Sequence, residues 1–328
     1  MKKKIALVTG GFSGEATISY RSAATIFNHL NKDLFDVYKI DVTTMGWFYE
    51  NAAGNKTEVD KNDFSIVENN SKINFDAVFI GMHGTPGEDG KLQGYFDMLQ
   101  LPYTSCNAAS SALTFNKRYA VAVARMAGVG VAQSVHLFKH TSYNLDEILA
   151  QLTPPLFIKP NNGGSSIGMS KVTEASQLEE ALQKAFKEDD QVLVEQMIEG
   201  REFTVGVYKS KGEINVLPIT EVMAHKEQSF FDFEAKYGGK STETTPAEIS
   251  DEWKNELENT AKKIYAVFNC AGVVRIDFIY NSNENRAYML EVNTIPGQSD
   301  ASVIPQQVRA AGGNLNDFYA SLVEEAMK

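Results

Sequence analysis

The sequence has little cysteine and no long apolar run. Cys106 and Cys270 are the only two cysteines among 328 residues, and they lie far apart with no metal-ligand spacing. Such scarcity argues against a disulfide-framed secreted domain and against a cysteine-ligated metal, and it is typical of reduced thiols in a cytosolic protein. No segment approaches the roughly 20 apolar residues of a membrane span. The apolar run at 5–8 follows three lysines but is too short for a signal peptide, so we predict a strand there and a cytoplasmic location.

Basic residues are also few relative to acidic ones. The chain has 31 lysines and arginines against 42 acidic residues, which gives a formal net charge of -11. A broad nucleic-acid surface needs an excess of positive charge, and so does attachment to an anionic membrane, so we predict neither kind of partner. Internal repeats and low-complexity segments are lacking as well. The length and the 43% of hydrophobic residues predict a folded protein of two or three domains.

The expected secondary structure changes character along the chain. The first third alternates in the manner of a parallel α/β sheet, with strands at 5–8, 37–41 and 77–80 and helices at 19–30 and 92–99. A helix at 116–127 then leads to a small α+β unit, with strands at 155–159, 169–172 and 192–195 and a helix at 174–186. From residue 201 the pattern is antiparallel, with strands at 202–208 and 214–219, a helix at 251–268, a hairpin and a last helix at 315–327. We therefore predict a fold that combines α/β and α+β parts.

Two alternating segments near the carboxyl-terminal end are the most informative feature. Arg275 and Asp277 share one face of the first segment, and Glu291 and Asn293 share one face of the second. If the segments pair as a hairpin, Asp277, Glu291 and Asn293 converge, and their oxygens are the hard donors that Mg²⁺ prefers. Arg275 beside them indicates phosphate chemistry. The alternative is an ordinary sheet with a polar outer face, although the turn after Asn293 adds backbone N–H groups that such a face does not require.

A second pattern joins a lysine to a loop of glycines and serines. Lys159 ends an apolar strand, and the segment 161–168 that follows is rich in glycine and serine. Glycines let backbone N–H groups approach an anion, serines add donors, and the lysine presents a cation to phosphate. This is not the Walker sequence, whose lysine follows the glycines. A plain hairpin turn would explain the glycines but not the lysine, whereas Lys117 on its own is most simply a surface lysine.

The amino-terminal loops carry weaker signals. The segment 9–14 follows the first strand, but its glycines are adjacent, and Glu15 stands where a carboxylate would repel pyrophosphate. Glu15 suits an ammonium group, and helix capping is its alternative role. His83 is a lone histidine in a glycine loop, where a hydrogen-bonding role is usual. The segment 230–239 mixes aromatic, charged and glycine residues and is typical of a lid that closes over a site.

Taken in order along the chain, these motifs resemble the ATP-grasp superfamily and, within it, the D-alanine–D-alanine ligase family. The resemblance rests on Gly10–Glu15 with Ile18 and Ser19, His83–Gly84 with Gly87–Gly90, Gln93 and Gly94, the loop Lys159–Gly168, Glu234–Tyr237, Arg275–Asp277, and Glu291–Thr294 through Gly297 to Ser302. It implies a three-domain ATP-grasp fold. The N-terminal α/β substrate-binding domain would span 1–105, the central lid domain 106–195, and the C-terminal catalytic domain 196–328.

The resemblance implies that ATP binds between the central and C-terminal domains. The nucleotide would contact Lys117, Lys159, Gly163, Gly164, Ser165, Ser166, Glu195, Gln196, Met197, Ile198, Glu202 and Lys236. The lysines and the glycine loop would contact phosphates, residues 195–198 the adenine, and Glu202 the ribose. Asp277, Glu291 and Asn293 would hold two Mg²⁺ ions, with Mn²⁺ as a substitute.

The resemblance also implies two D-alanine substrates and a role in peptidoglycan precursor synthesis. Glu15 would take the first ammonium group, with Ser165 and Tyr237 in a hydrogen-bonded group beside it and His83 among the substrate contacts. Arg275 and the Gly297 N–H would stabilise an oxyanion, and Ser302 with the Gly297 amide would meet the second substrate. The carboxylate of the first D-alanine would become an acyl phosphate that the amine of the second attacks. Family membership would fit a homodimer.

Two departures and two alternatives accompany the resemblance. Ala16 stands where many relatives carry a basic or histidine side chain, and the segment 297–301 differs where methionine and threonine often follow the glycine. An ATP-grasp ligase with another acceptor, such as D-lactate or a different amino acid, would keep all the phosphate residues. Tyr237 favours an enzyme that accepts an amine. A nucleotide-binding regulatory module without catalysis is the alternative from another class.

Overall fold

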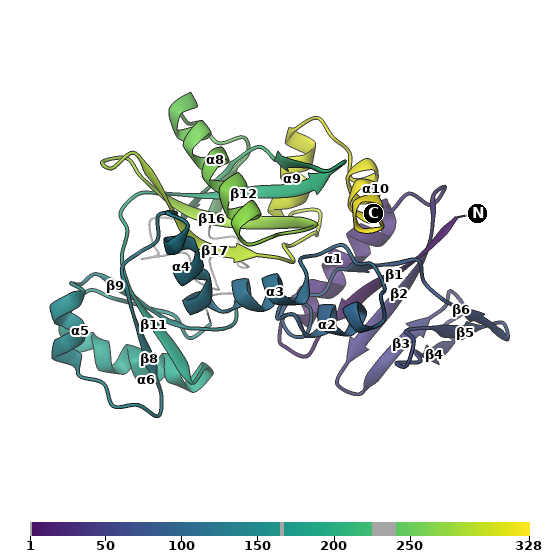
Figure 1. The fold of residues 1–328 in the computed structure, drawn as a ribbon, viewed down its shortest axis with the longest axis horizontal. Coiled ribbons are helices and arrows are strands. Elements are labelled where there is room, and N and C mark those ends of the chain that lie inside the picture. Colours follow the sequence, from purple (N-terminus) through teal and green to yellow (C-terminus); the bar gives the residue numbers. More distant parts are fainter. Residues whose placement is uncertain (1, 165–166, 225–240) are drawn as a thin grey trace.

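The computed structural model describes residues 2–164, 167–224 and 241–328, and it contains three main sheets (Figure 1). The C-terminal sheet lies between the N-terminal and central units, which occupy opposite ends of the long axis (Figure 1). The mixture of a parallel sheet with antiparallel sheets confirms the predicted fold class.

The N-terminal sheet has a parallel centre. Its five strands are ordered β4-β3-β2-β1-β7, with β1 parallel to both β2 and β7. The elements of this unit are β1 (Lys3–Gly10), α1 (Ala16–His29), β2 (Phe35–Thr43), β3 (Gly46–Glu50), β4 (Lys56–Glu58), β5 (Ile66–Glu68), β6 (Ser71–Ile73), β7 (Ala77–Ile80) and α2 (Lys91–Met98). The run from Ile5 to Val8 is fully buried, as a strand covered on both faces must be. The glycine loops at the carboxyl ends of β1 and β7 lie side by side, and the Phe12 N–H donates to the Thr85 carbonyl at 2.9 Å.

The central unit is a four-stranded antiparallel sheet in the order β10-β9-β11-β8. Its elements and the helices before it are α3 (Ala108–Phe115), α4 (Lys117–Met126), β8 (Ser134–Phe138), α5 (Leu145–Gln151), β9 (Leu156–Pro160), β10 (Ser170–Val172), η1 (Ala175–Gln177), α6 (Leu178–Glu188) and β11 (Gln191–Gln196). The apolar face of α6 packs on one side of this sheet. The opposite face carries the side chains of Phe157, Lys159, Leu193 and Glu195.

The C-terminal unit is built on an antiparallel sheet in the order β15-β14-β12-β16-β17, with β13 beside β12. Its elements are β12 (Arg201–Ser210), β13 (Glu213–Val216), β14 (Thr220–Ala224), β15 (Ser241–Thr244), α8 (Asp251–Val267), β16 (Val273–Asn281), β17 (Arg286–Asn293), α9 (Val303–Ala310) and α10 (Leu315–Ala326). Helix α8 covers one face through Leu257, Ala261 and Ile264, which are fully buried. The predicted hairpin is β16 and β17.

Several predicted boundaries were wrong, and several elements were not predicted. The predicted helix at 174–186 begins as an α-helix only at Leu178, because Glu174 and Gln177 form a capping box around a short 3₁₀ turn. The predicted strand at 214–219 ends at Val216. Strands β3–β6, β8, β14 and β15 and helices α3, α5 and α9 were missed. Most of these are short, so they offer few residues for a periodic pattern.

Two helices join units that are distant in sequence. Ala120 and Ala124 of α4 pack in the cluster of the C-terminal sheet, and Tyr319 of α10 packs against Phe79 of β7. The division at residues 105 and 195 stays a prediction. No helix in the described ranges is long and apolar enough to cross a membrane.

Candidate active site

The hairpin of β16 and β17 pairs the polar residues in register. Asp277 lies opposite Glu291 and Arg275 opposite Asn293, and a bulge follows Asp277. Opposed residues of an antiparallel pair project from the same face, so all four side chains occupy one patch. The convergence predicted from alternation is therefore present in the structure.

Asp277 is the buried centre of this patch. Its side chain accepts hydrogen bonds from Arg275 Nε at 2.9 Å and Nη2 at 2.8 Å, and from Thr204 Oγ1 at 2.5 Å. Arg275 Nη2 also lies 3.7 Å from Glu291 Oε1. A buried carboxylate needs such partners to offset the loss of water. The same contacts fix the guanidinium over both carboxylates.

The donor set fits a hard divalent cation. Two carboxylates and an amide oxygen are ligands for Mg²⁺ or Mn²⁺, whereas zinc sites favour cysteine and histidine. No group of three or more His, Cys, Asp or Glu that could hold a metal occurs within the described ranges. Any cation here would thus need Asn293, nucleotide phosphates and water as further ligands. Two of the Asp277 hydrogen bonds end on Oδ1 and one on Oδ2, which leaves Oδ2 as the better placed ligand atom.

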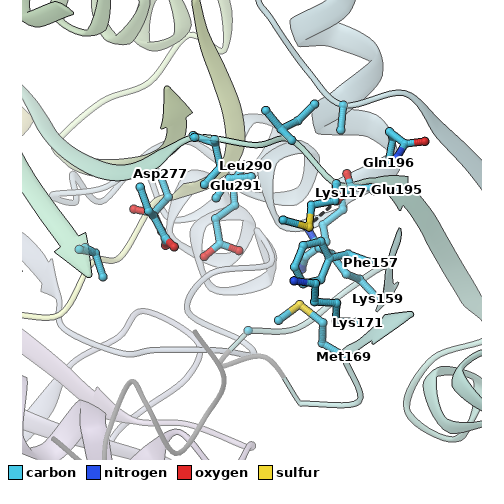
Figure 2. A pocket seen from close by; sticks show the side chains of 18 of the residues that line it. Lys117, Phe157, Lys159, Met169, Lys171, Glu195, Gln196, Asp277, Leu290 and Glu291 are labelled. Atoms are coloured by element: carbon cyan, nitrogen blue, oxygen red, sulfur yellow. Dashed lines mark hydrogen bonds and ion pairs between the residues drawn. The ribbon is translucent and has the colours of Figure 1, made fainter. Parts of the chain in front are cut away.

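Two cavities, of about 490 and about 340 Å³, meet at this patch. Both are lined by Lys117, Gly163, Gly164, Glu202, Val222, Asp277 and Glu291. The larger cavity extends over the central sheet, and Figure 2 shows Asp277 and Glu291 facing it from the side opposite Phe157 and Lys159. The smaller cavity extends toward the N-terminal unit. The patch is therefore a wall common to two binding compartments.

Lys159 projects from β9 into the larger cavity and pairs with Glu195 of the neighbouring strand β11. The side chains are 16% and 9% exposed, so the pair is largely removed from water. Burial alone would lower the pKa of Lys159, but the carboxylate of Glu195, with Glu291 and Glu202 further away, raises the pKa above its usual value. The ammonium group therefore stays charged at neutral pH.

Lys117 does not behave as an ordinary surface lysine. It begins α4 directly after the N-cap residue Asn116, and its Nζ donates to the Gly163 carbonyl at 2.7 Å. Gly163 has a φ of +93°, a backbone conformation that favours glycine. The lysine thus ties α4 to the glycine loop at the entrance of both cavities.

The predicted adenine-side residues line the larger cavity in different ways. Glu195, Met197 and Ile198 border it, while the Gln196 amide is bonded to Thr153 and directed away from Lys159 (Figure 2). Only the backbone of Gln196 is thus well placed for a ligand. Glu202 lies where the two cavities meet.

Glu15 lies at the start of α1 and faces the smaller cavity. It occupies the N-cap position, but its side chain makes no capping hydrogen bond, so capping does not account for it. A β-carbon at Gly84 would lie 2.6 Å from Glu15 Oε2, and one at Gly164 would lie 3.2 Å from Oε1. The carboxylate therefore sits between the N-terminal glycine loop and the phosphate loop, where the missing side chains of Gly84 and Gly164 leave room for it.

His83 is buried in a hydrogen-bonded group. Its Nε2 lies 2.8 Å from Ser22 Oγ, its Nδ1 3.7 Å from Glu88 Oε1, and its N–H donates to Ser19 Oγ at 2.9 Å. His83 borders the smaller cavity with Glu88. The histidine is thus a hydrogen-bonding loop residue that also reaches the site.

Gly297 and Ser302 border the other side of the smaller cavity. Ser302 precedes α9 but makes no side-chain cap, and its hydroxyl lies 2.7 Å from Ser299 Oγ. A β-carbon at Gly297 would lie 2.8 Å from Ser302 Oγ. Glycine at this position therefore lets the backbone approach the hydroxyl closely.

Sequence reasoning missed several lining residues. Phe157, Met169, Lys171 and Leu290 line the larger cavity (Figure 2), and Arg21 lines the smaller one. Phe157 could have been predicted from the sequence, because it lies two residues before Lys159 on β9 and therefore projects from the same face. Arg21 carried no such signal.

Four predicted site residues, Ser165, Ser166, Lys236 and Tyr237, lie outside the described residues. The proposed lid at 230–239 does so as well. Their roles stay predictions. The rest of the predicted set borders the two cavities or the hairpin.

Comparison with known proteins identifies the family. A family model described as the D-ala D-ala ligase N-terminus matches residues 4–106, and one described as its C-terminus matches residues 119–324. The D-alanine–D-alanine ligases of Parabacteroides distasonis and Flavobacterium johnsoniae are both 44% identical, over 100% and 98% of this chain and 98% of each relative.

Solved structures give the same result. D-alanyl-alanine synthetase A from Vibrio cholerae has a TM-score of 0.88 at 28% identity, over 99% of this chain and 98% of its own. A D-Ala:D-Ser ligase from Enterococcus faecalis has a TM-score of 0.87 at 31% identity, over 99% of this chain and 100% of its own. Since both family models match and the relatives cover almost the whole length, this chain belongs to the D-alanine–D-alanine ligase family of ATP-grasp enzymes.

Proposed function

We propose that this chain uses ATP to join two D-alanine molecules into D-alanyl-D-alanine through an acyl phosphate. The observation that supports this most strongly is the wall shared by the two cavities. A nucleotide in the larger cavity would present its terminal phosphate at Asp277 and Glu291. An amino acid in the smaller cavity, with its ammonium group at Glu15, would present its carboxylate at the same place.

The larger cavity would hold ATP. Its apolar side chains Phe157, Met197 and Ile198 suit the adenine ring, and Glu202 would accept hydrogen bonds from ribose. Lys159 and Lys117 would contact phosphates, because an ammonium group in a partly buried site interacts strongly with an anion. Asp277, Glu291 and Asn293 would hold two Mg²⁺ ions, which when bound neutralise phosphate charge and polarise the terminal phosphoryl group.

In the first step, a carboxylate oxygen of the first D-alanine attacks the terminal phosphorus of ATP. The bond between that phosphorus and the bridging oxygen breaks, and ADP leaves with the electron pair. Glu15 holds the ammonium group, which fixes the carboxylate near the phosphate. The lysines offset the repulsion between the two anions, and Lys236 is expected to contribute from outside the described residues.

In the second step, the amine of the second D-alanine attacks the acyl carbon and gives up a proton. The tetrahedral intermediate carries an oxyanion, which Arg275 and the Gly297 N–H would stabilise. Phosphate then leaves, and the amide bond remains. Ser302, close to Gly297, would contact the second substrate.

Phosphate release and product identification test this proposal. Release from ATP should require Mg²⁺ and increase with D-alanine but not with L-alanine, and mass spectrometry should identify the dipeptide. L-alanine is the matched control, since it has the same charges in the opposite configuration. An ATPase rate that is indifferent to D-alanine would leave only nucleotide binding.

One observation favours an additional acceptor class. Ser299 and Ser302 place two hydroxyls in the smaller cavity beside Gly297. A polar acceptor such as D-serine, or D-lactate, could hydrogen-bond there, and one structural relative is named a D-Ala:D-Ser ligase. An acceptor screen with D-alanine, D-serine and D-lactate identifies the preferred second substrate. We expect D-alanine to give the highest kcat/KM.

The product would serve peptidoglycan precursor synthesis in the cytoplasm. From the family resemblance we expect a homodimer. Light scattering on the purified protein measures its molar mass and tests this expectation.

A further inference from the structure

We propose that Gln298 is a positioning residue that aims the Gly297 N–H into the smaller cavity, and that Tyr319 holds Gln298 in place. This inference rests on the proposed function, in which the Gly297 N–H stabilises the oxyanion of the second step. Gln298 itself lines neither cavity.

The backbone N–H and both side-chain polar atoms of Gln298 form hydrogen bonds inside the protein. Gln298 is 4% exposed. Its Nε2 donates to the Pro296 carbonyl at 3.2 Å, its Oε1 accepts from the Tyr319 hydroxyl at 3.1 Å, and its N–H donates to Ser22 Oγ at 3.1 Å. A buried amide whose orientation is fixed at both ends can hold the group that it contacts.

The bond to Pro296 acts on the peptide that contains the Gly297 N–H. The carbonyl of Pro296 and the N–H of Gly297 belong to one planar unit, and this unit is trans, since the cis peptides of the described residues lie elsewhere. In a trans peptide the two groups point in opposite directions. Pro296 and Gly297 border the smaller cavity but Gln298 does not, so a carbonyl held toward Gln298 directs the N–H toward the cavity. The hydrogen bond also polarises the peptide and strengthens the N–H as a donor.

The anchors of Gln298 belong to two other elements. Tyr319 of α10 is fully buried, and its ring lies 5.6 Å from that of Phe79 in β7, edge to face. Ser22 of α1 is fully buried and also contacts His83. The loop that carries Gly297 is therefore held by helices from both ends of the chain. If Gln298 merely filled space, a leucine of similar volume would serve equally well.

The test is the variant Gln298→Leu, which removes both hydrogen-bonding groups of the side chain, compared with the unsubstituted enzyme in full kinetics. We expect kcat for dipeptide formation to fall about tenfold, because a misdirected donor forfeits part of the 10²- to 10³-fold that an oxyanion donor supplies. The KM values for ATP and both D-alanines should stay within about threefold. Rapid-quench measurements should show a larger burst of ADP before the steady state, because the first step is intact and the second is slower.

Tyr319→Phe and Tyr265→Phe form a matched pair of further variants. Tyr319→Phe removes only the hydrogen bond to Oε1 and should lower kcat about threefold, with unchanged KM. Tyr265→Phe removes an equally buried hydroxyl, which donates to the Gly272 carbonyl at 2.9 Å away from both cavities, and should leave kcat unchanged. If Gln298→Leu does not fold, Tyr319→Phe carries the same test.

Each outcome has one meaning. An unchanged kcat in Gln298→Leu, or a rise in KM without a fall in kcat, would overturn the role of Gln298. An equal loss in Tyr319→Phe and Tyr265→Phe would do so too, because the effect would then be general destabilisation. Absence of D-alanyl-D-alanine from the unsubstituted enzyme would instead overturn the proposed function.

Discussion

The two cavities are built in different ways. The larger one rests on adjacent strands, whose alternation places Lys159, Glu195 and Asp277 on faces that the sequence already reveals. The smaller one is assembled from loops and helix ends as far apart as Glu15 and Ser302. Charged side chains line both cavities, but the pair Lys159–Glu195 belongs to the larger one alone, and Glu15 and Ser302 belong to the smaller one alone. Phosphate binding can thus be read from local patterns, whereas selection of the amino acid depends on contacts between distant segments.

Replacement of Arg275 by methionine should have the largest effect, because this residue serves the wall common to both cavities. We expect turnover to fall by roughly 10²-fold or more, as for loss of an oxyanion donor, while nucleotide affinity changes little. Steady-state kinetics and nucleotide titration measure the two quantities. Arg286→Met, on the exposed end of the same hairpin, is the matched control and should leave both unchanged. Equal loss of affinity and turnover would contradict the assigned role.

Replacement of Glu15 by glutamine should affect the smaller cavity alone. A hydrogen bond to a charged group contributes about 2 kcal/mol, so the KM for the first D-alanine should rise about thirtyfold. The nucleotide dissociation constant should not change. If the nucleotide dissociation constant rose together with the KM for D-alanine, the two cavities would not be separate binding sites.

A matched control for Glu15 is Glu147→Gln. Glu147 also lies in the first turn of a helix, α5, but away from both cavities. Its loss should cost only the small interaction with the helix dipole, about 0.5 kcal/mol of stability. No change in any KM is expected.

Replacement of Lys159 by methionine should affect the larger cavity with the smallest change of the three. We expect nucleotide affinity to fall about tenfold, the lower end for a lost charged hydrogen bond. The raised pKa of Lys159 means that its contribution is fully present below the ordinary value of 10.5 and is lost only as pH rises through the higher folded value. The ratio of dissociation constants between variant and parent should therefore stay constant from about pH 7.5 to about 9.5.

Glu195 supplies the control for this variant. Lys159→Met leaves the buried Glu195 carboxylate without its lysine and should also destabilise the fold by about 3 kcal/mol. The double variant Lys159→Met/Glu195→Gln should recover much of that stability without recovering nucleotide affinity. The ratio of nucleotide dissociation constants between Lys159→Met and the parent tests the charge of Lys159. If this ratio already falls below about pH 9, Lys159 loses its proton at a lower pH than its contacts with carboxylates imply.

Much of the fold and the charged half of the site could be predicted from the sequence. The strand at 5–8 is a continuous apolar run and the β16–β17 hairpin alternates polar with apolar residues, so both were found. The short strands β3–β6 lack such periods and were missed. Gln298 was recognised only as a departure from relatives, because its contacts with Tyr319 and Ser22 join segments far apart in the chain.

The sequence by itself determined the alternation that puts Arg275, Asp277, Glu291 and Asn293 on one face, since the side-chain period of a strand is a local property of the backbone. It also determined that glycines follow Lys159. Only the tertiary structure decided that Lys117 reaches Gly163, that Glu15 lies against Gly84 and Gly164, and that two cavities share one wall. Those contacts depend on how three sheets pack, and packing is a property of the whole chain that no local period encodes.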